Sequence, residues 1–299
     1  MTALATVIIA VKHAMPELLE RLEESMFFFG KGETGAVLKT GDIDGWPHVS
    51  CELSGNNSTV SAEDVALLRY YLSQVLTDFI THNQQTVYLD QILGQYYFYF
   101  PQNEREEILR FAANKYNQES KSGKRLAMCG EIRNSLYQYL TKQGYINLHG
   151  FIVFRLQEWM SCLRQDVDQA VDDFLMEKEY QEFVKLLKYF VELQQPKINQ
   201  VHVVLDLQGN IQLLDQNYQH IDQSGMEWEN MWDEGEQDDH LVSMLITVAP
   251  HRVVLHRQIY THYAKATDTL KHVFENRVVL CKRCKLCQDI SGHLHLKGK

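Results

Sequence analysis

The predicted fold of the C-terminal region depends on residues 252–287, RVVLHRQIYTHYAKATDTLKHVFENRVVLCKRCKLC. Two similar apolar segments, RVVLH at 252–256 and RVVLC at 277–281, have the length and β-branched content of buried strands. Residues 264–275 between them have a helical pattern. A strand, a crossover helix and a second strand predict two adjacent parallel strands. Cys281 then lies at the carboxyl end of the last strand, where the functional loops of α/β sheets gather.

Three cysteines in a CxxCxxC pattern follow that strand. Cys281, Cys284 and Cys287 are separated by two residues each, which lets their thiolates turn toward one metal ion or cluster. Lys282, Arg283 and Lys285 lie between them and are expected to favour the thiolate form. The pattern favours a zinc site. An iron–sulfur cluster, a redox-active thiol pair and three reduced cysteines without a ligand stay open as alternatives.

A tetrahedral zinc site needs a fourth ligand in addition to the three thiolates. His293 lies a few residues beyond the last cysteine and is the ligand that we predict. His295 is a second candidate in the same segment. His256 is a third, because it ends the neighbouring predicted strand.

Before the predicted crossover, the sequence contains a clear β-hairpin. Apolar residues alternate over 201–207, Gly209 and Asn210 form a turn signal, and alternation resumes over 211–213. His202 and Asp206 are expected on the polar, solvent-facing side of this hairpin.

The remaining pattern predicts an α+β fold in three segments. Residues 1–60 have the strand and helix signals of a small α/β element. Residues 61–196 form a predominantly helical middle region, and Ser61 with Asp64 is typical of a helix cap. Residues 197–299 form a C-terminal α/β unit that consists of the β-hairpin and the βαβ unit.

The longest helical pattern runs over residues 150–193 and exceeds the usual length of a globular helix. We therefore expect two or three helices joined by tight bends. Four acids lie off its apolar face and are expected on a solvated surface: Asp166, Asp168, Asp172 and Asp173.

Charge is distributed unevenly along the chain, which has a formal net charge of −10. Residues 221–239 contain eight acids and no Lys or Arg, so we expect an acidic surface loop there. Trp228 and Trp232 indicate that part of this loop docks on the protein body or a partner. Residues 251–299 contain ten Lys and Arg against three acids. Nucleic-acid binding by this basic tail is an alternative that is not favoured, because no known reading motif accompanies the charge.

The sequence predicts a cytoplasmic protein. Cys51, Cys129 and Cys162 are isolated from one another, as in proteins of reducing compartments. Neither a secretion signal nor an apolar run long enough for a membrane span is visible. No acid–base pair, nucleophile with its base, or dinucleotide fingerprint occurs at a recognisable spacing, which favours a binding or structural role over catalysis.

Several blocks of the chain resemble a known family. INLHGFIVFRL at 146–156, EKEYQEFVKLLKYFVELQQPKI at 177–198, LVSMLITVAPHRVVLH at 241–256 and RVVLCKRCKLC at 277–287 are similar to the YtxC-like family of sporulation proteins. The resemblance implies a cytosolic protein of endospore-forming bacteria with a role in sporulation and no established reaction. It also implies that the three terminal cysteines belong to the family pattern.

These observations together predict a non-enzymatic sporulation factor. Its C-terminal module is expected to be held by a metal ion on the CxxCxxC motif. The sequence does not identify a protein partner.

Overall fold

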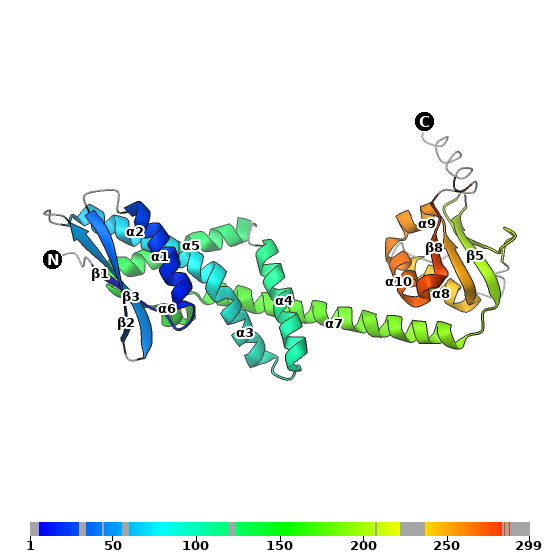
Figure 1. Ribbon diagram of the computed structural model, residues 1–299, viewed down its shortest axis with the longest axis horizontal. Coiled ribbons are helices and arrows are strands. Elements are labelled where there is room, and N and C mark those ends of the chain that lie inside the picture. Colours follow the sequence, from blue (N-terminus) through cyan, green and yellow to red (C-terminus); the bar gives the residue numbers. More distant parts are fainter. Residues whose placement is uncertain are drawn as a thin grey trace, which may run out of the picture. The chain divides into compact units, whose positions relative to one another are not determined.

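The computed structural model describes residues 6–29, 34–43, 45–55, 60–119, 123–206, 208–221, 237–282, 284 and 287. The chain divides into two compact units, Met1–Met176 and Glu177–Lys299. Each unit has its own hydrophobic core. Sheets near both ends of the sequence and helices in its middle confirm the α+β class predicted above (Figure 1).

The first unit contains a four-stranded sheet in the order β2-β3-β1-β4. Strand β4 pairs in parallel with β1, and Ile146 lies opposite Ile9. This strand was not predicted, because the sequence indicates only helices over residues 61–196. Three residues with one buried side chain are too few to show the alternation of a strand. The strands are β1 (Thr6–Ala10), β2 (Thr34–Ile43), β3 (Trp46–Gly55) and β4 (Tyr145–Asn147).

Helices supply most of the first unit and pack their apolar faces against one another and the sheet. The second of them begins with the predicted cap: the Ser61 hydroxyl accepts from the Asp64 amide at 3.1 Å, and the Asp64 carboxylate accepts from the Ser61 amide at 3.0 Å. The helices are α1 (Met15–Phe29), α2 (Ala62–Phe79), α3 (Gln85–Tyr96), α4 (Gln102–Glu119), α5 (Gly123–Lys142), α6 (Leu148–Arg155) and α7 (Gln157–Leu193), with a π-helical turn, Ile80–Gln84, between α2 and α3.

The long helical pattern over residues 150–193 is divided between two helices, α6 and α7, in agreement with the prediction of two or three. The chain breaks once, at Leu156, and then continues as one helix of 37 residues. Residues 157–193 contain neither Gly nor Pro, so nothing in them ends a helix. The helix also gains burial in both units, because Phe174 belongs to the first core and Val191 to the second.

One acid of α7 is buried, contrary to the prediction of a solvated acidic surface. Asp166 forms an ion pair with Arg125 of α5, and both side chains are less than a tenth exposed. The Arg125 guanidinium also lies 4.5 Å from the centre of the Tyr116 ring. Asp168 accepts a hydrogen bond of 2.8 Å from the Tyr97 hydroxyl. Helical spacing alone does not reveal these partners, because they come from other helices.

The second unit contains a four-stranded sheet in the order β6-β5-β7-β8. The predicted hairpin is present as β5 and β6, and Gly209 in its turn has a φ of 93°, which suits glycine. The predicted parallel pair is present as β7 and β8, but β8 is an edge strand whose three residues are half-buried or exposed, contrary to the prediction of two buried strands. Strand β5 pairs in parallel with β7 on its other side. The strands are β5 (Ile198–Leu205), β6 (Ile211–Leu214), β7 (Pro250–Leu255) and β8 (Val278–Leu280).

Three helices cover one face of this sheet (Figure 1). They are α8 (Gln237–Val248), α9 (Arg257–His262) and α10 (Ala264–Phe274). Leu245 of α8 and Leu270 of α10 join Val203 and Val253 of the strands in the core. The predicted acidic loop over 221–239 ends in the first turn of α8, while Trp228 and Trp232 lie outside the described residues. Among the described helices, none has the length and apolar character needed to cross a membrane.

Replacing Asp166 by Ala is expected to destabilise the first unit by about 3–5 kcal/mol, because it leaves the Arg125 charge in the interior without its carboxylate. Replacing both residues, as Arg125→Met with Asp166→Leu, removes both charges and is expected to cost much less. Urea unfolding of the three proteins measures the difference. Equal destabilisation by the single and double changes would contradict this account.

Candidate metal centre

The candidate site lies at the carboxyl ends of β7 and β8. Their parallel register places Leu255 beside Leu280, so the residues that follow, His256 and Cys281, leave the sheet next to each other. The Cys281 amide donates to the Leu255 carbonyl at 2.9 Å and extends the pairing by one residue. The Tyr260 hydroxyl donates to the Cys281 carbonyl at 3.2 Å and helps to fix the chain at this point.

Four side chains from these segments converge. Possible ligand atoms of His256, Cys281, Cys284 and Cys287 all lie within 4.8 Å of one another. Nδ1 of His256 is 3.3 Å from the sulfur of Cys284 and 3.3 Å from that of Cys287. The sulfur of Cys287 is 3.7 Å from that of Cys284 and 3.9 Å from that of Cys281.

These distances fit a single tetrahedral metal ion. Zinc with Zn–S bonds of about 2.3 Å holds its sulfurs about 3.8 Å apart, close to the observed sulfur separations. Three thiolates and one imidazole are also a known donor set of structural zinc sites. His256 and Cys287 are buried, and Cys281 and Cys284 are half-buried, so a bound ion would be shielded from most of the solvent.

A second histidine supports the ring of His256. Nε2 of His256 lies 3.1 Å from Nδ1 of His202. Nε2 of His202 in turn lies 2.8 Å from the side-chain amide nitrogen, Nε2, of Gln200. The ring of Tyr218 lies 4.8 Å from the His202 ring. Thus Nδ1 of His256 faces the sulfurs while Nε2 is engaged by His202. This arrangement resembles the hydrogen bonds that orient metal-binding histidines in general.

The expectation that His202 and Asp206 are solvent-facing is wrong for His202, which is buried. Residues of a strand alternate between faces, and His202 lies opposite Val254, two residues before His256. The two histidines therefore share the sheet face that does not carry the core. Asp206 accepts from the amides of Gln208 and Asn210, both at 2.8 Å, and stabilises the hairpin turn.

Burial shifts the pKa of two of these four side chains, His256 and Cys281. It lowers the pKa of His256 to about 4, helped by the neighbouring His202, so the imidazole is neutral with a lone pair available. Burial and hydrogen bonds to the other two thiols raise the pKa of Cys281 to about 12. This is opposite to the expectation that nearby lysines favour the thiolate. A metal cation supplies the positive charge that ionises such thiols.

The structure brings three of the four predicted site residues together. Cys281, Cys284 and Cys287 form the cluster, whereas His293 and the other downstream candidate, His295, lie outside the described residues. His256, the candidate based on strand position, lies within the cluster. All six cysteines are free, so no disulfide competes for these thiols.

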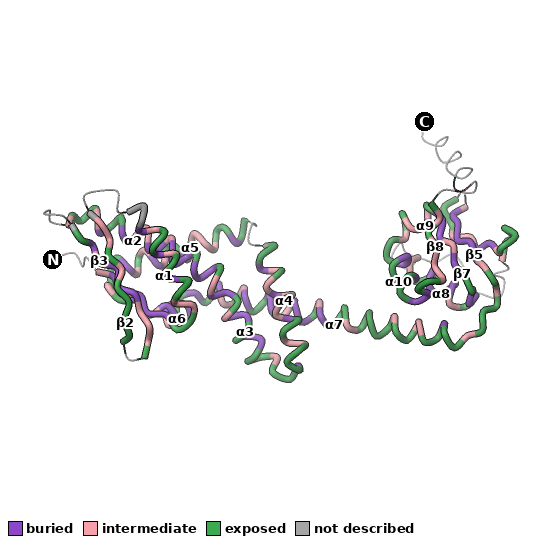
Figure 2. Tube along the Cα trace, viewed as in Figure 1, coloured by how far each residue is buried: buried purple, intermediate pink, exposed green. Residues whose placement is uncertain are grey.

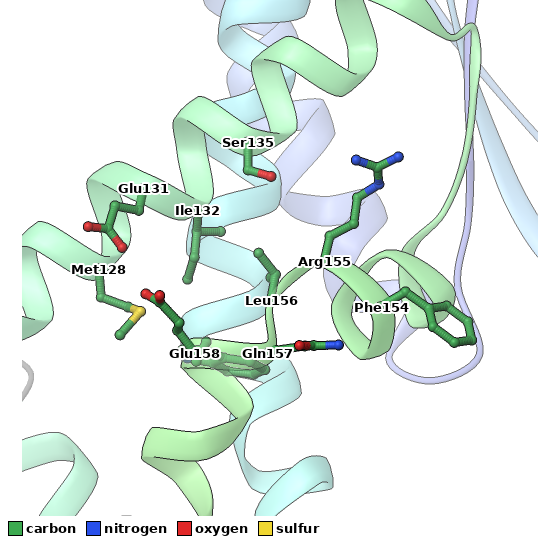
Figure 3. Close-up of a pocket in the computed structure, with 10 residues that line it drawn as sticks. Met128, Glu131, Ile132, Ser135, Phe154, Arg155, Leu156, Gln157 and Glu158 are labelled. Atoms are coloured by element: carbon green, nitrogen blue, oxygen red, sulfur yellow. The ribbon is translucent and has the colours of Figure 1, made fainter.

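A different cavity, of about 370 Å³, lies in the first unit between α5 and the start of α7. Glu131 and Glu158 line one side, and Phe154 points away from it (Figure 3). The Arg155 guanidinium lies 5.1 Å from the centre of the Tyr139 ring. The lining residues include neither a cysteine nor a histidine that would suggest a nucleophile or a metal ligand, so we assign no chemistry to this cavity.

Comparisons with known proteins agree with the sequence resemblance. The model of the YtxC-like family matches residues 70–279. The chain belongs to the YtxC-like family. An uncharacterized protein named YtxC from Bacillus subtilis (strain 168) is 26% identical over 222 residues, which cover 71% of this chain and 76% of that protein. No solved structure matches. The family match includes His202 and His256 but ends before Cys281.

Replacing His202 by Ala is expected to weaken metal binding by about 10- to 100-fold, because His256 loses the partner that orients its ring. Titration of metal-free protein with Co²⁺ against a competing chelator measures the affinity. His251→Ala is the matched control, because His251 is an exposed histidine of the same unit. Unchanged Co²⁺ affinity in the His202 variant would refute this role.

Proposed function

We propose that this protein is a non-enzymatic sporulation factor of the cytoplasm whose C-terminal module is held together by zinc. Cys281, Cys284, Cys287 and His256 are the proposed ligands. The observation that carries the metal assignment is the convergence of four donor atoms within 4.8 Å. The resemblance to a family of sporulation proteins supports the cellular role, and the free, isolated cysteines support the compartment.

Zinc acts here as a cross-link within the fold. Its ligands come from the end of β7 and from the segment after β8, so an ion joins that segment to the sheet edge. Because the four donors are together only in the folded chain, binding free energy of the ion becomes folding free energy. The zinc ion supplies no reaction in this proposal, since the four protein ligands complete its tetrahedral coordination.

The sulfur separations favour a single ion over the iron–sulfur alternative. A [4Fe–4S] cluster binds one cysteine on each iron and a [2Fe–2S] cluster binds two ligands on each iron, so in neither do three thiolates and an imidazole meet at one point. Sulfurs 3.7 and 3.9 Å apart are the neighbours expected around one ion. The raised pKa of Cys281 also disfavours this cysteine as a reactive redox thiol, because the thiolate is the reactive form.

Purified protein is expected to contain one equivalent of zinc, and Cys284→Ser is expected to lose most of it. Loss of the ion destabilises the second unit, by about 4 kcal/mol if free zinc stands at a thousand times its dissociation constant. Elemental analysis and chelator-dependent unfolding measure both effects. Cys129→Ser is the control, because this half-buried cysteine lies in the first unit. Zinc-free protein with an intact second unit would rule out the metal assignment.

The same measurements identify the fourth ligand. His256→Ala should lower zinc affinity strongly, whereas His293→Ala should leave it unchanged. The opposite result would assign the fourth position to the ligand predicted from sequence. Iron in place of zinc, with visible charge-transfer absorption, would favour the iron–sulfur alternative.

Deletion of the gene is expected to lower the yield of heat-resistant spores in an endospore-forming host. Wild-type protein and Cys129→Ser should restore the yield, and Cys284→Ser should restore it only in part, because its C-terminal module is loosened. Counting heat-resistant colonies after sporulation measures the effect. A normal spore yield in the deletion strain would remove the cellular part of the proposal and leave the zinc site intact.

A further inference from the structure

The second half of α7 presents a row of large apolar side chains to solvent. Phe183, Leu186, Phe190 and Leu193 are 52%, 65%, 61% and 66% exposed, respectively. Their spacing of three, four and three residues places them in one seam, as in the repeat through which helices pair with each other. Figure 2 shows this part of the helix largely in the colour of exposed residues. We call these four residues the α7 seam.

The core of the second unit does not require the α7 seam. Val184, Leu187 and Val191 of the same helix already pack into that core. They lie on a neighbouring face of the helix, so α7 has one apolar face directed inward and another directed outward. Single exposed apolar side chains are common, but a contiguous row of them indicates an interaction surface.

A groove runs beside the seam, between α7 and α8. Two cavities of about 580 and 620 Å³ form it, the first lined by Phe183 and the second by Phe190. Ile246 and Thr247 of α8 line both cavities, which makes the groove continuous along the seam. The same face thus offers projecting side chains and the adjacent space to receive such side chains.

Charges at the two ends of this face have opposite signs. Glu179 and Glu182 of α7 and Asp239 of α8 are exposed at the end near Phe183. Lys197 is exposed at the other end, where it lines the groove with Phe190. The charges of this face are therefore complementary to those of a second copy related by a 180° rotation.

We propose that this face joins two copies of the chain into a two-fold symmetric dimer, with α7 antiparallel to α7. A two-fold axis lets the seam of each copy fill the groove of the other, because both features lie on one face. The antiparallel direction places the acidic end of each copy against Lys197 of the other. A parallel pair would place the acidic ends together, where they repel. The dimer does not depend on the metal centre.

Sedimentation equilibrium of the full chain tests the proposal. The wild-type protein is expected to be a dimer, and Leu186→Glu and Phe190→Glu are each expected to weaken dimerisation by about tenfold or more, since each places a charge in the apolar centre. Leu126→Glu is the matched control, because Leu126 is 62% exposed on α5 of the first unit. Circular dichroism and thermal unfolding confirm that every variant is folded.

Charge reversal tests the antiparallel direction. Lys197→Glu should weaken the dimer, and adding Glu182→Lys to it should restore association. Failure of the double change to restore the dimer refutes the antiparallel arrangement. A wild-type monomer throughout the micromolar range, or a dimer insensitive to both Leu186→Glu and Phe190→Glu, overturns the proposal.

Discussion

The pairing of β7 with β8 is the constraint on which the candidate metal centre depends. Their register aligns Leu255 with Leu280 and so brings His256 beside Cys281, although 25 positions separate these two residues in the chain. A slip of one residue would turn every side chain of the strand to the opposite sheet face. The imidazole would then point away from the thiols. The β7–β8 pairing that fixes this register therefore also determines which ligands meet.

His256 links the metal centre to the interior of the sheet. One nitrogen faces the sulfurs and the other faces His202, whose ring is itself held by Gln200. Burial keeps His256 neutral and the Cys281 thiol protonated in the absence of a cation. Binding of a divalent ion releases thiol protons, so the metal affinity depends on pH. The folding stability of this unit then depends on both metal and pH.

The sequence predicts those parts of the fold and site that depend on local pattern. The two RVV triplets, the crossover between them and the cysteine spacing are local, and the structure contains all three. Pairings across elements are not local. His202 was missed because alternation in a hairpin does not say what covers its polar face, and Asp166 because its partner Arg125 lies on another helix. Strand β4 was missed because its three residues are too few to show the alternation of buried and exposed side chains that indicates a strand.

Helix α7 shows a further limit of periodicity. Its apolar positions predict an amphipathic helix, but they do not identify what covers each face. Between Trp159 and Phe174 the apolar stripe is narrow and buried in the first core. From Phe183 to Leu193 the apolar arc is broader, because residues that face the second core alternate with exposed ones. A helix that packs against a single core needs only one apolar stripe. The width of the apolar arc is thus the sequence signal that separates a core helix from one that also forms an interface.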